Sequence, residues 1–278
     1  MKTIFSKMLY IVAISAIFTS CKNEVDITPV NPLEGLTKLQ EGYALGASAK
    51  VQIWGKKNFF MGYNKLTVVL LDSLNLTDTI KDAHIHFMPV MTMGTGMMAM
   101  THACPIENPE EEPVNGVFPG AVAFVMPTSI DGIWKLGVMV HNHKYDKEGT
   151  ASFNVTVDNP TPSVMSVFTA TSADASKLVL SLVEPVAPKV GMNDIEFTLH
   201  RKETMLSWPA DSTYTFVIAP EMPSMGHGSP NNVNPVHVGN GHYKGKVNFT
   251  MTGEWKVNVA VQKNGNTISN NAYFTITF

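Results

Sequence analysis

The fold of this 278-residue chain is indicated first by one alternating stretch, Trp255-Lys-Val-Asn-Val-Ala-Val261. Its apolar residues recur at every second position, which is the period of a half-buried β-strand. The segment Lys263-Asn264-Gly265-Asn266 follows, and its Asn-Gly pair favours a tight hairpin turn. Residues 272–278 then supply a second alternating run. The C-terminal end therefore predicts a β-hairpin.

This hairpin belongs to an internal duplication that covers most of the chain. Four sequence blocks recur in the same order, which indicates two copies of one domain. The matching blocks are 62–70 with 191–199, 88–91 with 222–225, 116–126 with 241–251, and 132–136 with 253–257. We predict one domain over residues 36–158, a second over 164–278, and a stiff proline-containing linker at 159–163.

Each copy consists of short runs rich in β-branched and aromatic residues, which favour strands. The clearest runs in the first copy are 66–70, 121–125, 136–140 and 151–157. About seven such strands in roughly 120 residues are typical of an immunoglobulin-like sandwich. We therefore predict an all-β protein with two tandem immunoglobulin-like β-sandwich domains. Trp134 and Trp255 each begin a strand, and we expect both in the cores.

The first 20 residues have the pattern of an export signal. An apolar run at 8–18 follows two lysines and is too short to span a bilayer as a helix. The following residues resemble the cleavage site of a bacterial lipoprotein signal, although Phe18 stands where an aliphatic residue is usual. We expect cleavage before Cys21, lipid on its thiol, and a polar tether over 21–35. A plain secretory signal is the alternative. Both place the mature protein outside the cytoplasm, and the lipid anchor places it in the cell envelope, facing the periplasm or the outer membrane.

Charge and motifs argue against two functional classes. The formal net charge is −3, and the chain has no basic patch, so we expect no nucleic-acid partner. The sequence contains no Gly-x-Ser-x-Gly elbow, no His-Glu-x-x-His pair and no phosphate loop. We therefore expect no enzyme activity.

The chemistry is concentrated in a methionine-rich stretch of the first copy. Six of the 17 methionines lie within residues 88–100. Thioether, imidazole and thiolate donors suit Cu(I) and related soft ions. A hydrophobic loop that uses methionine to fill irregular gaps is the alternative. We predict a soft-metal site with copper as the expected ion. Its predicted ligands are His84, His86, Met88, Met91, Met93, His102 and Cys104.

The spacing around the first histidines fits a strand. His84, His86 and Met88 alternate with Ile85 and Phe87, so the three donors share one face. If the apolar pair faces the core, the donors point together to the other side.

Two further groups of donors are weaker candidates. His141 and His143 lie where another predicted strand ends, and they are possible additional ligands or simply an exposed polar turn. In the second copy, Met222, Met225 and His227 form a smaller version of the cluster. Two glycines flank His227 and allow a tightly folded loop there.

Cys104 is one of only two cysteines. If Cys21 carries lipid, Cys104 has no intramolecular partner in an oxidising compartment. A metal-bound thiolate explains this best. A disulfide with Cys21 and a buried, inert thiol are the alternatives.

The second copy contains Met222-Pro-Ser-Met-Gly-His-Gly228, then Gly241-His-Tyr243 and Met251-Thr-Gly-Glu-Trp255. This arrangement resembles the YtkA-like domain, a family of exported bacterial β-sandwiches often grouped with metal-handling proteins. The first copy carries the same skeleton with a longer insertion at 92–115. The resemblance implies heavy-metal biology, chiefly of copper, outside the cytoplasm. It implies no reaction.

Together these patterns indicate an exported, lipid-anchored copper-binding protein for metal buffering, sensing or delivery. Its expected partners are the membrane, through the lipid, and a metal-donor or metal-acceptor protein. The alternative is an envelope binding or adhesion module whose methionines form an apolar contact patch for a protein or glycan.

Replacing Cys21 by Ser is expected to release the protein from membranes, because the lipid is attached to that thiol. Membrane fractionation followed by immunoblotting measures this, with Cys104→Ser as the matched control. Retention of the Cys21→Ser variant in the membrane fraction would refute lipidation.

Overall fold

Trp134 and Trp255 lie in two separate hydrophobic cores. Both side chains are fully buried. Each indole N–H donates a hydrogen bond to a backbone carbonyl, that of Met126 at 2.9 Å and that of Met251 at 3.0 Å. The computed structural model describes residues 31–171 and 175–278, so the export signal and Cys21 lie outside the described residues. The predicted core position of both tryptophans is confirmed.

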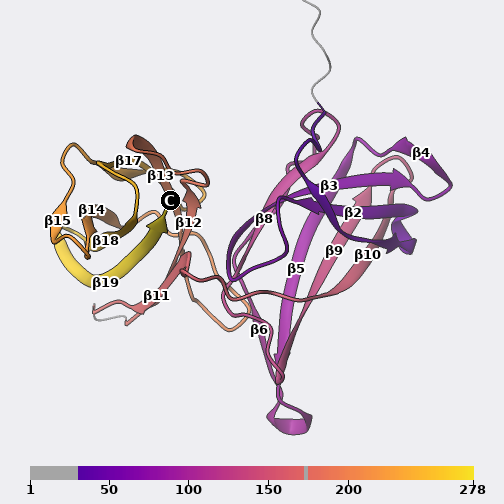
Figure 1. Cartoon of the computed structure of the whole chain (residues 1–278). Coiled ribbons are helices and arrows are strands. Elements are labelled where there is room, and N and C mark those ends of the chain that lie inside the picture. The colour runs from indigo at the N-terminus through magenta and orange to yellow at the C-terminus, as the bar shows by residue number, and fades with distance from the viewer. Residues whose placement is uncertain (1–30, 172–174) are drawn as a thin grey trace, which may run out of the picture. The chain divides into compact units, whose positions relative to one another are not determined.

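The first sandwich consists of two antiparallel sheets (Figure 1). One sheet has the order β1 (Thr37–Ala44), β2 (Ala49–Gly55), β3 (Gly62–Asp72), β8 (Phe118–Phe124) and β7 (Ile106–Glu107), with β4 (Asn75–Thr79) paired to β3. The other has the order β10 (Lys147–Val155), β9 (Gly132–Asn142), β5 (Ala83–Met93) and β6 (Met100–Ala103). Two short 3-10 turns, η1 (Leu45–Ala47) and η2 (Gly96–Met98), complete it. The core between these sheets is drawn from residues 44–157.

The second sandwich repeats this plan. One sheet has the order β11 (Met165–Thr169), β12 (Lys177–Glu184), β13 (Gly191–Arg201), β17 (His242–Phe249) and β16 (Val233–Gly239). The other has the order β15 (His227–Gly228), β14 (Thr215–Met222), β18 (Glu254–Lys263) and β19 (Asn266–Thr277). The predicted all-β fold of two sandwiches is confirmed. Within the described residues, no helix has the length and hydrophobicity that crossing a bilayer requires.

The methionine-rich stretch begins as a strand. β5 extends through Met93, and its odd-numbered residues Ile85, Phe87 and Met91 are buried while His84 and His86 are exposed. Side chains two apart share a face of a strand, so this parity fixes which donors reach the surface. The predicted common face of His84, His86 and Met88 is therefore confirmed, because Ile85 and Phe87 lie in the core.

Strand pairing corrects one of the four sequence matches. In the β5–β9 pair, Met91 lies opposite Trp134. In the β14–β18 pair, Glu221 lies opposite Lys256, so the next residue, Met222, is at the level of Trp255. Met91 and Met222 are therefore equivalent, and both are buried. The sequence match of 88–91 with 222–225 aligned the two Met-Pro pairs, and this alignment is wrong by three residues. The underlying reason is that register is set by pairing with the next strand and not by local composition.

The β9–β10 turn is held by buried polar groups. Asp72, at the end of β3, is 2% exposed and accepts hydrogen bonds from Lys144 Nζ at 2.7 Å and Tyr145 Oη at 2.5 Å. Asn142 is fully buried and donates to the carbonyl of Ala47 at 2.9 Å. The hydrogen bond from Lys144, followed by that from Tyr145, lowers the pKa of Asp72 from 3.8 to about 2. This turn therefore has a defined position above the sheet.

Glu107 is held in a network of buried and half-buried polar side chains. It lies on β7 and accepts hydrogen bonds from Tyr63 Oη at 2.7 Å and from His242 Nε2 at 2.7 Å. The second ring nitrogen of His242 bonds Glu196 at 2.6 Å. Burial disfavours the charged imidazole, but the bonds to Glu107 and Glu196 outweigh it and raise the pKa of His242. A small cluster that includes Ala121 packs beside this network.

Cutting the chain near Pro160 is expected to give two halves that each fold, because each half contains its own tryptophan-centred core. Near-ultraviolet circular dichroism of segments 36–158 and 164–278 measures this. Each half is expected to be modestly less stable than the intact chain. Ala121 from the first half and Val179 from the second are buried in one hydrophobic cluster, and the cut exposes both. A half without fixed aromatic signals contradicts the two-domain prediction.

The Asp72→Asn variant is expected to lower the melting temperature in a pH-dependent way. Because folding depresses the pKa of Asp72 to about 2, its stabilising effect is complete above the ordinary value of 3.8 and disappears as the pH falls toward 2. The difference in melting temperature between wild type and variant should therefore be full at pH 6 and shrink below about pH 4. Asp78→Asn, an exposed carboxylate on β4, is the control. A difference that stays constant down to pH 2 contradicts this account.

Candidate functional site

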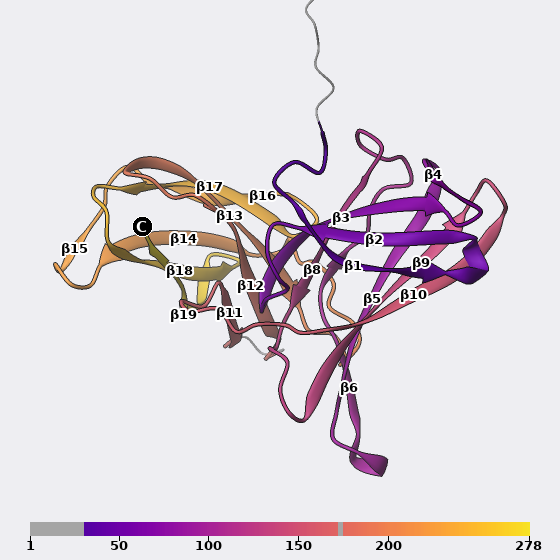
Figure 2. The same cartoon turned by 45° about the vertical axis from the view of Figure 1, so that its right-hand side comes forward.

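The outer face of the β5–β9 pair carries the candidate site. These two strands lie side by side in both views of the fold (Figure 2). Their register sets His84 opposite His141 and His86 opposite Met139. Directly opposed residues on one face have Cβ atoms about 4.5–5.5 Å apart, close enough for two imidazoles to touch. The hairpin turn that follows β9 then brings His143 over the same face.

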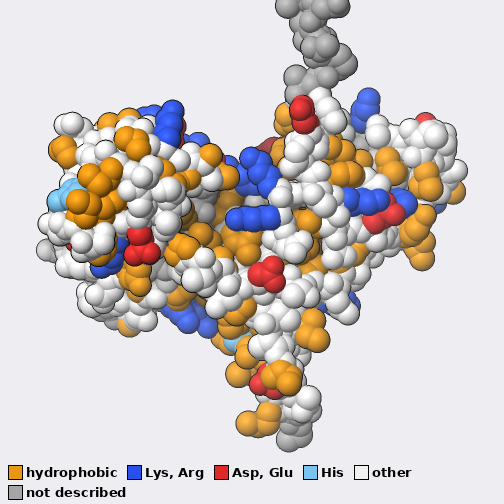
Figure 3. Space-filling view, in the orientation of Figure 1, with side chains coloured by type: hydrophobic (Ala, Val, Ile, Leu, Met, Phe, Trp, Pro, Cys, Tyr) orange, Lys and Arg blue, Asp and Glu red, His pale blue; other side chains and the backbone are white. Residues whose placement is uncertain are grey.

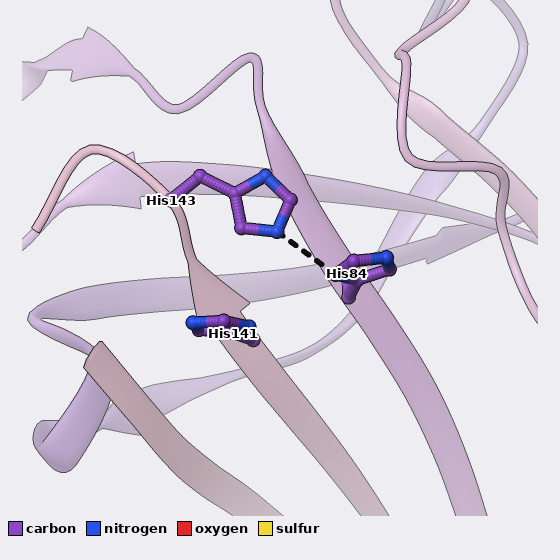
Figure 4. Close-up of side chains that lie close together, drawn as sticks. All are labelled: His84, His141 and His143. Carbon is purple, nitrogen blue, oxygen red and sulfur yellow. Dashed lines mark hydrogen bonds between the residues drawn. The ribbon is translucent and has the colours of Figure 1, made fainter. Parts of the chain in front are cut away.

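Three imidazoles converge there (Figure 4). One ring nitrogen from each of His84, His141 and His143 lies within 4.8 Å of the other two. His143 Nε2 is 2.8 Å from His84 Nδ1. The rings of His84 and His141 are stacked with centroids 6.1 Å apart, and the His143 ring stands edge-on to both. We call these three residues the His triad.

Each ring of the His triad also contacts a carboxylate. His143 Nδ1 bonds Asp82 at 2.5 Å, and His141 Nε2 bonds Asp146 at 3.0 Å. His84 Nε2 bonds Glu111, which belongs to the acidic loop after β7. A carboxylate on one ring nitrogen orients the imidazole and makes the other nitrogen a better ligand. His84 Nδ1, His141 Nδ1 and His143 Nε2 are the nitrogens without a carboxylate, and those of His84 and His143 share a hydrogen bond with each other.

His143 owes its position to the anchored turn. Its backbone N–H donates to the carbonyl of Asp82 at 3.3 Å, so the turn and the segment before β5 are connected twice at this residue. The neighbouring Lys144 is bonded to buried Asp72. A ligand on an anchored turn keeps its geometry better than one on a free loop.

His86 shares the face of His84 but is otherwise engaged. The Asn108 side-chain oxygen accepts the backbone N–H of Phe87 at 2.9 Å, which fixes the orientation of the amide. The Asn108 amide nitrogen therefore donates to His86 Nδ1 at 2.7 Å. This leaves the proton of the neutral ring on Nε2, so neither nitrogen offers a free lone pair. His86 lies beside the His triad without joining it.

Met88 and Met139 are the sulfur side chains on this face. Met88 is half-buried against Gly137, four residues along β5 from His84, which is about 13 Å of strand. Met139 lies opposite His86 and two residues before His141. The sequence reasoning missed Met139, although its spacing from His141 is the same two-residue signal that linked His84 to His86.

The other predicted ligands of the first copy lie elsewhere. Met91 and Cys104 are 1% and 4% exposed and pack in the core, on the opposite side of the sheet from the His triad. Burial raises the pKa of the Cys104 thiol well above its ordinary value, which disfavours a thiolate ligand. Met93 packs partly against the core, and His102 lies on β6 opposite Met91. One ion cannot contact these residues and the His triad together.

The smaller donor set of the second copy is also dispersed. Met222 is 3% exposed in the core, whereas Met225 is 60% exposed in a tight turn. His227 lies edge-on to Trp255, with ring centroids 5.7 Å apart. Packing explains Met222 and His227 without a ligand.

The second sandwich serves as an internal comparison for the His triad. Thr215 lies opposite Gln262 in the β14–β18 pair, as His84 lies opposite His141 in the β5–β9 pair. Asn264 occupies the turn position of His143. The sandwich forms without histidine at all three places, so folding does not account for the His triad.

Comparisons with known proteins give a family match for part of this chain and distant structural similarity for most of it. No curated protein matches it. In structure it is similar to the Escherichia coli adhesin FdeC, with 14% identity and a TM-score of 0.25, over 86% of this chain and 65% of the adhesin chain. It is also similar to a conserved domain protein from Bacillus anthracis, with 11% identity and a TM-score of 0.32, over 86% of this chain and 82% of that one. Residues 172–260 match the family model described as YtkA-like, and residues 175–260 of this span lie in the second sandwich.

Proposed function

We propose that this protein is an exported metal-binding protein whose first sandwich holds a transition-metal ion between His84, His141 and His143. The observation that carries the proposal is the convergence of one nitrogen from each ring within 4.8 Å. Imidazole is a good ligand for copper, zinc, nickel and iron. Copper is the expected ion, because divalent copper binds a given nitrogen site most tightly among the first-row metals.

Exposure of the site fits reversible binding. The side chain of His84 is 52% exposed, and those of His141 and His143 are 36% and 24% exposed. Three protein ligands leave a coordination position for water or for a ligand from another molecule. Such a site suits buffering, sensing or delivery of the ion to a partner protein. We propose this role without catalysis, in a protein attached to the envelope by lipid on Cys21.

A second candidate function rests on the β5–β6 hairpin. Met98 and Met100 are 83% and 56% exposed, and hydrophobic side chains are visible on this hairpin (Figure 3). Exposed methionine adapts to varied partner surfaces. The hairpin supports the alternative of a binding or adhesion module for a protein or glycan. It lies at the end of β5 opposite to His84, so the two functions are separable by mutation.

The double variant His84→Ala/His143→Ala is expected to lose at least about 10-fold in affinity for Cu(II) and for Zn(II), because two of three ligands are removed. Isothermal titration calorimetry of the mature protein measures this. Wild type should bind one equivalent and melt at a higher temperature with metal than with chelator, because the ion binds the folded state.

The matched control is His227→Ala/His237→Ala in the second sandwich, which should bind as wild type does. Met98→Ser/Met100→Ser should also leave metal affinity unchanged. Equal affinity of the wild type and the His84→Ala/His143→Ala variant contradicts the proposed function.

A further inference from the structure

We infer that the His triad binds divalent ions that prefer tetragonal coordination, such as Cu(II), more tightly than Cu(I). The methionine-rich sequence had led us to expect Cu(I). This rests on the proposed function and deepens it. Three observations support it: the separation of two donor nitrogens, the type of donor atoms present, and the charge that surrounds them.

The first observation is a distance. His84 Nδ1 and His143 Nε2 share a hydrogen bond of 2.8 Å, and a bound ion would take the place of its proton. Two nitrogens bound at about 2.0 Å to one ion are about 2.8–2.9 Å apart at a right angle, but about 3.3 Å apart in a tetrahedron and about 3.5 Å apart in a trigonal plane. Right angles between neighbouring ligands belong to octahedral, square-planar and tetragonal sites, and the last two are typical of Cu(II) and Ni(II). Tetrahedral and trigonal sites suit Zn(II) and Cu(I), and they require this pair to move apart.

The second observation is the set of donor atoms. The atoms that converge are three imidazole nitrogens, and the carboxylate oxygens of Asp82, Glu111 and Asp146 bond the other nitrogen of each ring. Nitrogen and oxygen donors favour divalent ions, whereas Cu(I) favours sulfur. The nearest thioether by strand register is that of Met139, which is opposite His86 and not opposite a triad residue. Met91 and Cys104 pack in the core, so their sulfur atoms cannot reach an ion at the His triad.

The third observation is charge. Three carboxylates bond the three rings, so the site presents three formal negative charges around the imidazoles. The lysine of the same turn, Lys144, is bonded to Asp72 instead. A divalent ion gains more than a monovalent one from each of these carboxylates, because the Coulomb energy scales with the product of the charges. These carboxylates are exposed, so solvent and salt weaken this effect without changing its sign.

The test compares the two oxidation states of copper in one protein. The reduction potential of copper bound to the mature protein is measured against that of aqueous copper in the same buffer. A potential below the aqueous couple means that the site binds Cu(II) more tightly than Cu(I). We expect this result, together with an electron paramagnetic resonance signal of axial Cu(II) that shows coupling to several nitrogens.

Two variants separate the causes. Asp82→Asn/Glu111→Gln should weaken Cu(II) binding by roughly 10–100-fold and raise the potential, because these carboxylates orient the rings and supply charge. Asp131→Asn, an exposed carboxylate at the far end of β9, is the matched control and should change neither. Met139→Leu should leave the potential unchanged.

The outcomes are distinguishable from failure of the proposed function. If copper does not bind, or binds equally to His84→Ala/His143→Ala, the proposed function itself fails. If copper binds through the His triad but with a potential at or above the aqueous couple, the inference of divalent selectivity is overturned while metal binding stands. A potential that falls markedly on Met139→Leu also overturns it, because a thioether would then be a ligand.

Discussion

The antiparallel pairing of β5 with β9 is the interaction on which the rest of this structure depends. Its register places Met91 opposite Trp134 toward the core and His84 opposite His141 toward solvent. A slip of one residue would turn the histidines into the core and expose Ile85 and Phe87. The cost of burying unpaired imidazoles and exposing large apolar groups therefore holds the pairing in place. Core packing and the His triad are two consequences of one register.

The two sandwiches share a framework and differ in chemistry. Met91 and Met222 fill equivalent core positions, and Trp134 and Trp255 make the same hydrogen bond to a backbone carbonyl. At the outer face the first sandwich has three histidines where the second has polar, uncharged side chains. The fold thus supplies a scaffold that tolerates either set, and the function resides in the side chains that the scaffold displays.

The His triad combines a fixed base with an accessible surface. Asp72 and Asn142 are buried beneath the β9–β10 turn, and their hydrogen bonds determine where His143 lies. The carboxylates that orient the rings are exposed, so they orient without closing the site. Rigid support below and solvent above are the features expected where a ligand must be held specifically and released readily.

The sequence by itself determined the β-sandwich class, the duplication, the buried tryptophans and the common face of His84, His86 and Met88, because these follow from period-two alternation and repeated blocks. Only the tertiary structure decided that His143 approaches His84, 59 positions away. It also decided that the Asn108 side chain hydrogen-bonds to His86, and that Met91 and Cys104 belong to the core. Alternation is local and is written in the residues of one strand. Which residues face each other across strands depends on hydrogen-bonded register and turn anchoring, and these arise only when distant segments pack together.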